Sequence, residues 1–169
     1  LRSGEAQAAD EFSRTEGGFS RFNFDVNHVS KLSKVTQFYI FAHGQLANRN
    51  LDSSEQFYLG GADAVRAYPQ GEAGGDSGYQ ATAELRYQTP VKGMSMTLFA
   101  DVGEVLARKD GDTSDPHRRL AGWGIGAVYS LDRSLYARLD YARKIKGESY
   151  RSEAEDKNGR LWFRLYKLF

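Results

Sequence analysis

The chain has 169 residues, and 23 Lys and Arg against 22 Asp and Glu give a formal charge of +1, which offers no basic excess for nucleic acid. Its longest apolar run is the five residues 38–42, whereas a transmembrane helix needs about 20. Aromatic residues at 13% argue against a disordered chain, and the absence of Cys excludes disulfides, thiolate metal sites and cysteine nucleophiles.

Alternation of apolar and polar residues predicts β-strands along most of the chain. The alternation is strictest over residues 79–88, where every odd position is apolar and every even position is polar or charged. No helix is predicted. In chain order we predict seven strands, over residues 21–27, 35–46, 79–88, 94–105, 120–130, 135–142 and 160–169.

The connections between these strands alternate between short and long. The long ones cover roughly residues 47–77, 107–119 and 145–159. An outer-membrane barrel has this pattern, because its tight turns face the periplasm and its long loops face outside. Seven strands cannot close a barrel of the usual even number, so we expect a segment of a longer barrel. A soluble β-sandwich or lipocalin-like barrel is the alternative, because alternating strands also build soluble sheets.

The most distinctive motif lies in the first long connection. Leu59-Gly60-Gly61 is followed there by Val65-Arg66-Ala67-Tyr68, and Phe99-Ala100-Asp101-Val102-Gly103 occupies the second strand after it. Over about residues 18–169 the chain resembles the outer-membrane transporters of two-partner secretion, the haemolysin and filamentous-haemagglutinin secretion/activation family (TpsB type). Ala67 departs from the family pattern, which usually has Gly at this position.

The resemblance implies an all-β fold, an antiparallel transmembrane β-barrel segment that forms the C-terminal part of a sixteen-stranded barrel. It also implies that residues 47–77 form a loop that folds into the barrel lumen. The plug helix, the two periplasmic POTRA domains and the first strands of such transporters are expected to lie outside residues 1–169. A barrel-assembly insertase of the same superfamily is the second candidate, and a soluble β-rich ligand-binding or adhesive domain is the third.

The implied function is passage of a large partner exoprotein, such as a haemolysin, adhesin or contact-dependent toxin, through the lumen. The implied location is the outer membrane of a Gram-negative bacterium. Expected partners are the exoprotein, outer-membrane lipid or lipopolysaccharide, and the barrel-assembly machinery, but no nucleic acid. We expect no enzymatic step, no cofactor and no metal.

The resemblance further implies that Arg66 docks on Asp101 inside the barrel. The residues support this, because a guanidinium that enters a narrow lumen needs a paired carboxylate, and Glu84 and Asp101 lie on polar phases of adjacent strands. The paired glycines allow the backbone to reverse. The candidate site residues are the loop motif Gly60, Gly61, Val65, Arg66, Ala67 and Tyr68, the docking acids Asp101 and Glu84, and the strand residues Phe99 and Gly103.

The alternation predicts that each strand has a polar face that lines the hydrated lumen and an apolar face that contacts lipid. Phe169, at the end of an apolar alternation, resembles the C-terminal signal by which outer-membrane barrels are recognised for insertion. The apolar positions expected to face lipid are Tyr79, Ala81, Ala83, Leu85, Tyr87, Leu135, Ala137, Leu139 and Tyr141. The polar positions expected to line the lumen are Arg21, Asn23, Asp25, Asn27, Gln80, Thr82, Arg138, Asp140 and Arg164.

Three further patterns are less specific. Gly122-x-Gly124-x-Gly126 lies inside a strand with no helix after it, so room for a loop backbone is a better interpretation than nucleotide binding. The acidic residues at 110–115 are expected to form a surface turn, with weak Ca²⁺ binding as the alternative, because a bidentate Glu at calcium-site spacing is lacking. His28, His43 and His117 share no ligand spacing, and neither a zinc site nor a catalytic triad is expected.

Overall fold

The computed structural model describes residues 18–107, 117–131, 134–145 and 158–168. Every regular element in these ranges is a strand, and none of the described residues belongs to a helix that could serve as a membrane span. In chain order the strands are β1 (Arg21–Lys31), β2 (Thr36–Ala47), β3 (Phe57–Leu59), β4 (Ala73–Gly75), β5 (Ser77–Gln88), β6 (Met94–Leu106), β7 (His117–Ser130), β8 (Leu135–Lys144) and β9 (Gly159–Lys167).

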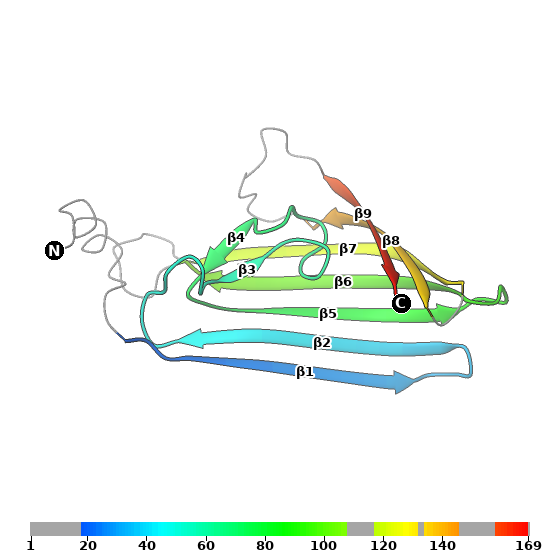
Figure 1. Ribbon diagram of the computed structural model, residues 1–169, viewed down its shortest axis with the longest axis horizontal. Coiled ribbons are helices and arrows are strands. Elements are labelled where there is room, and N and C mark those ends of the chain that lie inside the picture. The colour runs from blue at the N-terminus through cyan, green and yellow to red at the C-terminus, as the bar shows by residue number, and fades with distance from the viewer. Residues whose placement is uncertain (1–17, 108–116, 132–133, 146–157, 169) are drawn as a thin grey trace.

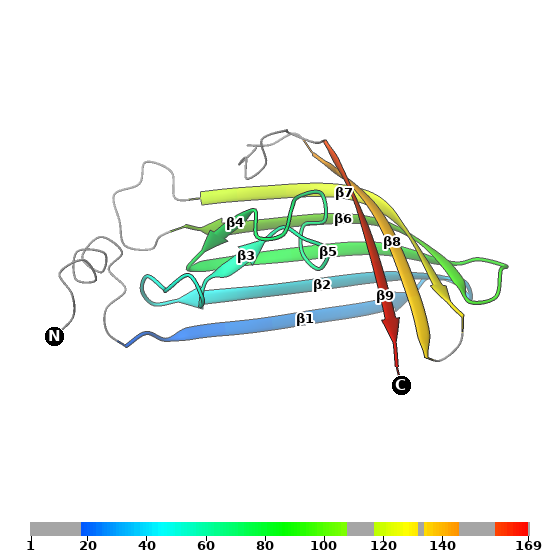
Figure 2. The same ribbon diagram turned by 45° about the horizontal axis from the view of Figure 1, so that its top comes forward.

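Seven of these strands form one antiparallel sheet in the order β1-β2-β5-β6-β7-β8-β9. Each strand pairs with the next one along the chain, apart from the hairpin of β3 and β4, which is inserted between β2 and β5. The sheet curls toward its end, so that β8 and β9 cross obliquely over the other strands (Figures 1 and 2). The curl places the last strand close to the inserted segment.

The two faces of the sheet differ in polarity because the side chains alternate along each strand. Large apolar residues cover the outer face and remain open, with exposed fractions of 52% for Leu98, 51% for Ile125 and 65% for Phe163. The inner face buries charged residues, Asp101 and Asp140 among them. This is the reverse of a water-soluble sheet, and it is the arrangement of a strand wall between lipid and a polar interior.

The long connection between β2 and β5 packs against the inner face of the sheet. β3 contacts β5 and β6, and β4 contacts β6. At its base, the Gln45 side-chain amide donates to the carbonyls of Glu55 at 2.9 Å and of Asp76 at 3.1 Å. The residues of the loop and sheet that form the buried apolar core are Phe57, Leu59, Val65, Ala67, Tyr68, Ala73, Phe99, Val105, Leu120 and Ala142.

The structure confirms the seven predicted strands and corrects their ends. β7 begins at His117 rather than at residue 120, and β9 ends at Lys167. The strands β3 and β4 were not predicted, because three residues each are too few to show an alternation. Phe169 and the acidic turn at residues 110–115 lie outside the described residues.

Candidate functional site

The tip of the long connection is a closed turn whose neck is formed by paired glycines. Gly60 and Gly61 have φ angles of +87° and +114°, a backbone region that residues with a Cβ rarely adopt. The Gly61 amide donates to the Tyr68 carbonyl at 3.1 Å, which closes residues 61–68 into a compact tip. Val65 and Tyr68 are 0% and 1% exposed, so the tip is anchored by apolar burial on both sides of Arg66.

Arg66 is held by the two carboxylates that the sequence proposes. Its Nε and Nη2 donate to the two oxygens of Asp101 at 2.9 and 2.7 Å, and its backbone amide donates to Asp101 Oδ2 at 3.1 Å. Its Nη1 donates to Glu84 Oε1 at 2.9 Å. The side chains of Arg66 and Asp101 are 4% and 1% exposed. A two-pronged contact of this kind needs the planar guanidinium fork.

Two neighbours on the sheet fix this contact. The guanidinium carbon of Arg66 lies 3.3 Å from the centroid of the Phe99 ring, in a stacked cation–π contact. The Thr82 hydroxyl donates to Asp101 Oδ1 at 2.9 Å. Phe99 and Asp101 are two residues apart on β6, so one strand face supplies both the ring and the carboxylate.

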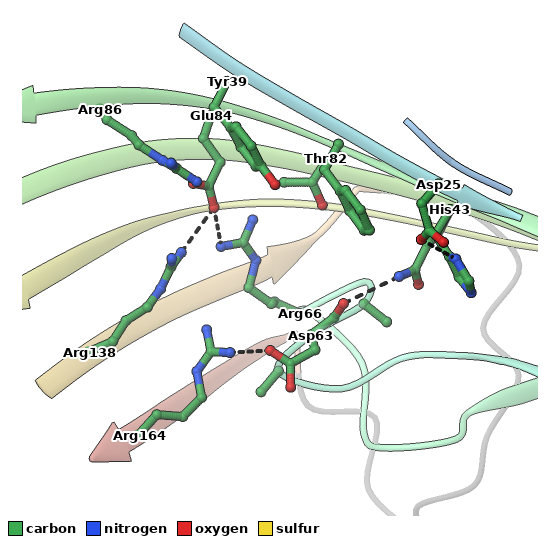
Figure 3. A pocket seen from close by; sticks show the side chains of 14 residues that line it. Asp25, Tyr39, His43, Asp63, Arg66, Thr82, Glu84, Arg86, Arg138 and Arg164 are labelled. Atoms are coloured by element: carbon green, nitrogen blue, oxygen red, sulfur yellow. Dashed lines mark hydrogen bonds and ion pairs between the residues drawn. The ribbon is translucent and has the colours of Figure 1, made fainter. Parts of the chain in front are cut away.

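The network around Arg66 extends to further arginines (Figure 3). Glu84 also accepts hydrogen bonds from Arg86 at 2.7 Å and from Arg138 at 3.0 Å. Asp140 accepts from Arg138 at 2.7 Å and lies 3.7 Å from Arg66 Nη1. Arg164 contacts Asp140 at 3.2 Å and also pairs with Asp63 on the loop tip. Four arginines thus face four carboxylates, and the cluster carries no net charge.

The glycine series of β7 makes room for the site. A Cβ on Gly122 would lie 2.6 Å from the Cβ of Ala67, so the methyl group of Ala67 occupies the space that this glycine leaves. A Cβ on Gly124 would meet the Phe99 ring, and one on Gly126 would meet the carboxylate of Asp140. The three glycines therefore leave room for the Ala67 methyl group of the loop, the Phe99 ring and the carboxylate of Asp140.

A cavity of about 470 Å³ lies beside the loop tip, toward β1 and β2. Figure 3 shows Arg66, Glu84 and Arg138 on one side of it and the Asp25–His43 pair on the other. His43 Nδ1 lies 2.7 Å from Asp25, and His117 Nδ1 lies 2.7 Å from Glu104. Within the described ranges, no three His, Cys, Asp or Glu residues converge as they would around a metal ion.

The structure brings most of the proposed site residues together and adds others. Gly103 faces the loop as well, since a Cβ there would lie 2.6 Å from Leu59 Cδ2. Asp140, Arg138 and Arg164 were predicted as polar wall residues but not as members of the Arg66 network. Trp162 was not predicted to take part, although its indole donates to the Arg66 carbonyl at 2.7 Å. Alternation assigned these side chains to a face and could not show which of them meet.

Comparison with known proteins gives a consistent result. Residues 1–129 match the family model described as haemolysin secretion/activation protein ShlB/FhaC/HecB. The chain is 33% identical over 98 residues to the heme/hemopexin transporter protein HuxB of Haemophilus influenzae strain 86-028NP, which covers 56% of this chain and 17% of that protein. HuxB of strain KW20 / Rd is 32% identical over 100 residues, which covers 57% of this chain and 18% of the relative.

The fold also has a solved counterpart. CdiB from Acinetobacter baumannii aligns with a TM-score of 0.67 and 22% identity, over 88% of this chain and 27% of that chain. At this identity the likeness shows a shared fold. The chain spans about one sixth of the length of the HuxB relatives, so it corresponds to a part of such a protein.

Proposed function

Because the chain belongs to the haemolysin secretion/activation family ShlB/FhaC/HecB, we propose that it forms part of a transporter that moves a secreted partner protein outward in two-partner secretion. Members of this family are outer-membrane β-barrel transporters of Gram-negative bacteria. The apolar outer face of the sheet suits contact with outer-membrane lipid, and the charged inner face suits a hydrated passage. The family match favours secretion over barrel assembly.

The observation that carries the proposal is the docked Arg66. The loop packs on the inner face, where it would narrow the passage, and the buried guanidinium of Arg66 holds it there through non-covalent contacts that can open. After such a withdrawal Glu84 keeps charged partners, because it still contacts Arg86 and Arg138. We propose that residues 47–77 are the movable element of the passage and that Arg66, Asp101 and Glu84 hold its resting position. No enzymatic step is needed.

The cargo is proposed only by class, as a secreted partner protein. HuxB is named as a heme/hemopexin transporter, which makes a heme- or hemopexin-related exoprotein one possible cargo of this chain. The mixed charges of the inner face, with Arg138 and Arg164 beside Glu84 and Asp140, suit a chain that must pass without binding tightly. Insertion by the barrel-assembly machinery, with Phe169 as its signal, remains a prediction.

The experiment compares Arg66→Ala with Arg119→Ala in the full-length transporter, with its partner protein expressed in the same cells. Arg119 is the matched control, since it also pairs with an acid, Glu104, but is 74% exposed. We expect Arg66→Ala to reduce the partner protein in the medium strongly, because removing one member of a buried pair costs about 3–5 kcal/mol. Arg119→Ala should secrete normally, because exposed pairs contribute about 0–1 kcal/mol.

The amount of transporter in the outer membrane is measured for both variants. Loss of secretion with normal insertion supports the proposal. Normal secretion by an inserted Arg66→Ala protein would contradict it.

A further inference from the structure

The last strand of the sheet also contacts the loop, at two points. The indole Nε1 of Trp162 donates a hydrogen bond of 2.7 Å to the carbonyl oxygen of Arg66, a residue 96 positions earlier in the chain. Arg164, two residues further along β9, pairs with Asp63 on the loop tip and contacts Asp140 on β8 at 3.2 Å. Both side chains lie on the inner phase of β9, because their neighbours Leu161, Phe163 and Leu165 are exposed on the outer face.

These contacts hold Arg66 from two directions. Asp101 on β6 binds the amide and the guanidinium of Arg66, whereas Trp162 on β9 binds its carbonyl. The amide and the carbonyl of one residue are therefore fixed by strands that are three places apart in the sheet order. The curl of β8 and β9 over the loop makes this possible (Figure 2). Because both backbone polar groups of Arg66 are held, the loop backbone at this residue cannot leave the inner face without breaking the contacts with Asp101 and Trp162.

We propose that Trp162 is a positioning residue for Arg66 and that β9 is a second attachment for the loop. The Arg164–Asp63 pair is the other contact of this attachment. The loop then leaves the inner face only when both the β6 and the β9 attachments open. The proposal rests on the proposed function only in treating the loop as movable. It follows that side-chain changes on β9 alter the docking of Arg66 without touching Asp101 or Glu84.

The test measures amide hydrogen exchange in the full-length protein by mass spectrometry, in peptides that cover residues 61–68. The amides of Gly61, Ala64, Arg66 and Tyr68 all donate hydrogen bonds in this tip, so its exchange reports on docking. Trp162→Phe removes the indole donor and keeps an aromatic ring. The matched control is Trp123→Phe, because Trp123 is the other tryptophan of the chain and is 46% exposed on the outer face.

We expect Trp162→Phe to speed exchange in the loop tip roughly fivefold, the effect of losing one hydrogen bond, with β8 and β9 unchanged. Trp123→Phe should leave the tip unchanged. Asp63→Asn, which alters only an exposed loop residue, should shift exchange in the same direction by a smaller factor.

Unchanged exchange in the tip of the Trp162→Phe protein would overturn the proposal. Equal acceleration in the tip and in β8 and β9 would also overturn it, since Trp162 would then only support the sheet. Exchange is measured without secretion, so this result stands apart from the Arg66→Ala test. A transporter in which Arg66 is not needed for secretion could still show Trp162-dependent docking.

Discussion

A buried guanidinium is stable only where its charge is matched, and Arg66 meets carboxylates from β5, β6 and β8. The acids do not depend on it equally. Glu84 has Arg86 and Arg138, and Asp140 has Arg138 and Arg164. In the described part of the chain, Asp101 has no paired cation other than Arg66. Withdrawal of the loop therefore leaves one carboxylate, Asp101, with the Thr82 hydroxyl as its remaining side-chain contact.

The close approach of Ala67 to Gly122 can be tested by a substitution at Gly122. Gly122→Ala adds a Cβ that would lie 2.6 Å from the Ala67 Cβ, so the loop must shift away from β7. We expect weaker docking and less secretion, because overpacking a well-packed contact costs about 1–3 kcal/mol. Ala67→Gly in the same protein should restore much of the loss. The measurement is secretion per inserted transporter, and failure of the second change to restore any secretion would contradict this packing.

Part of the site could be predicted from the sequence. Arg66, Asp101 and Glu84 could be named because the family motif joins the loop to β6 and because both acids lie on the polar phase of their strands. The effect of Ala67 in place of the usual Gly could not be judged, because its fit depends on Gly122, which lies 55 residues further along the chain. The contact of Trp162 depends on the curl of the sheet, which alternation alone does not encode.

Individual strands carry the two-faced pattern that positions the site. On β8 the exposed Leu139 and Tyr141 alternate with Arg138 and Asp140 of the inner network. This alternation was readable from the sequence because each strand is long enough to repeat it several times. The hairpin of β3 and β4 was not readable, since its order comes from packing on β5 and β6 rather than from its own pattern.

Leu139 tests the assignment of the two faces. Leu139→Arg places a charge in the middle of β8 on the apolar face, and it should destabilise the protein in a bilayer by about 2–4 kcal/mol. Gln80→Arg on the inner face of β5, which borders the cavity, should have little effect. Unfolding from lipid vesicles in denaturant measures both. Equal destabilisation by the two changes would show that the faces are assigned wrongly.

For the whole molecule, the decisive feature is that the sheet begins at β1 and ends at β9 without joining them in the described residues. Both outer edges can accept further strands, as expected for a chain that aligns with 27% of the CdiB chain. The curl that would close such a sheet also brings β8 and β9 over the loop (Figures 1 and 2). The curl of the sheet at β8 and β9 therefore accounts both for the curvature that a barrel needs and for the contact of β9 with the docked loop.

We propose that Arg66 and Asp101 act in secretion through their mutual contact. The most direct test is a double-mutant cycle of secretion per inserted full-length transporter with Arg66→Lys, Asp101→Asn and both changes together. Each single change should reduce secretion partly, because an ammonium cannot form the two-pronged contact and an amide lacks the charge. We predict that the double variant secretes at least as much as whichever single variant secretes less. A loss equal to the product of the two single losses would contradict the claim.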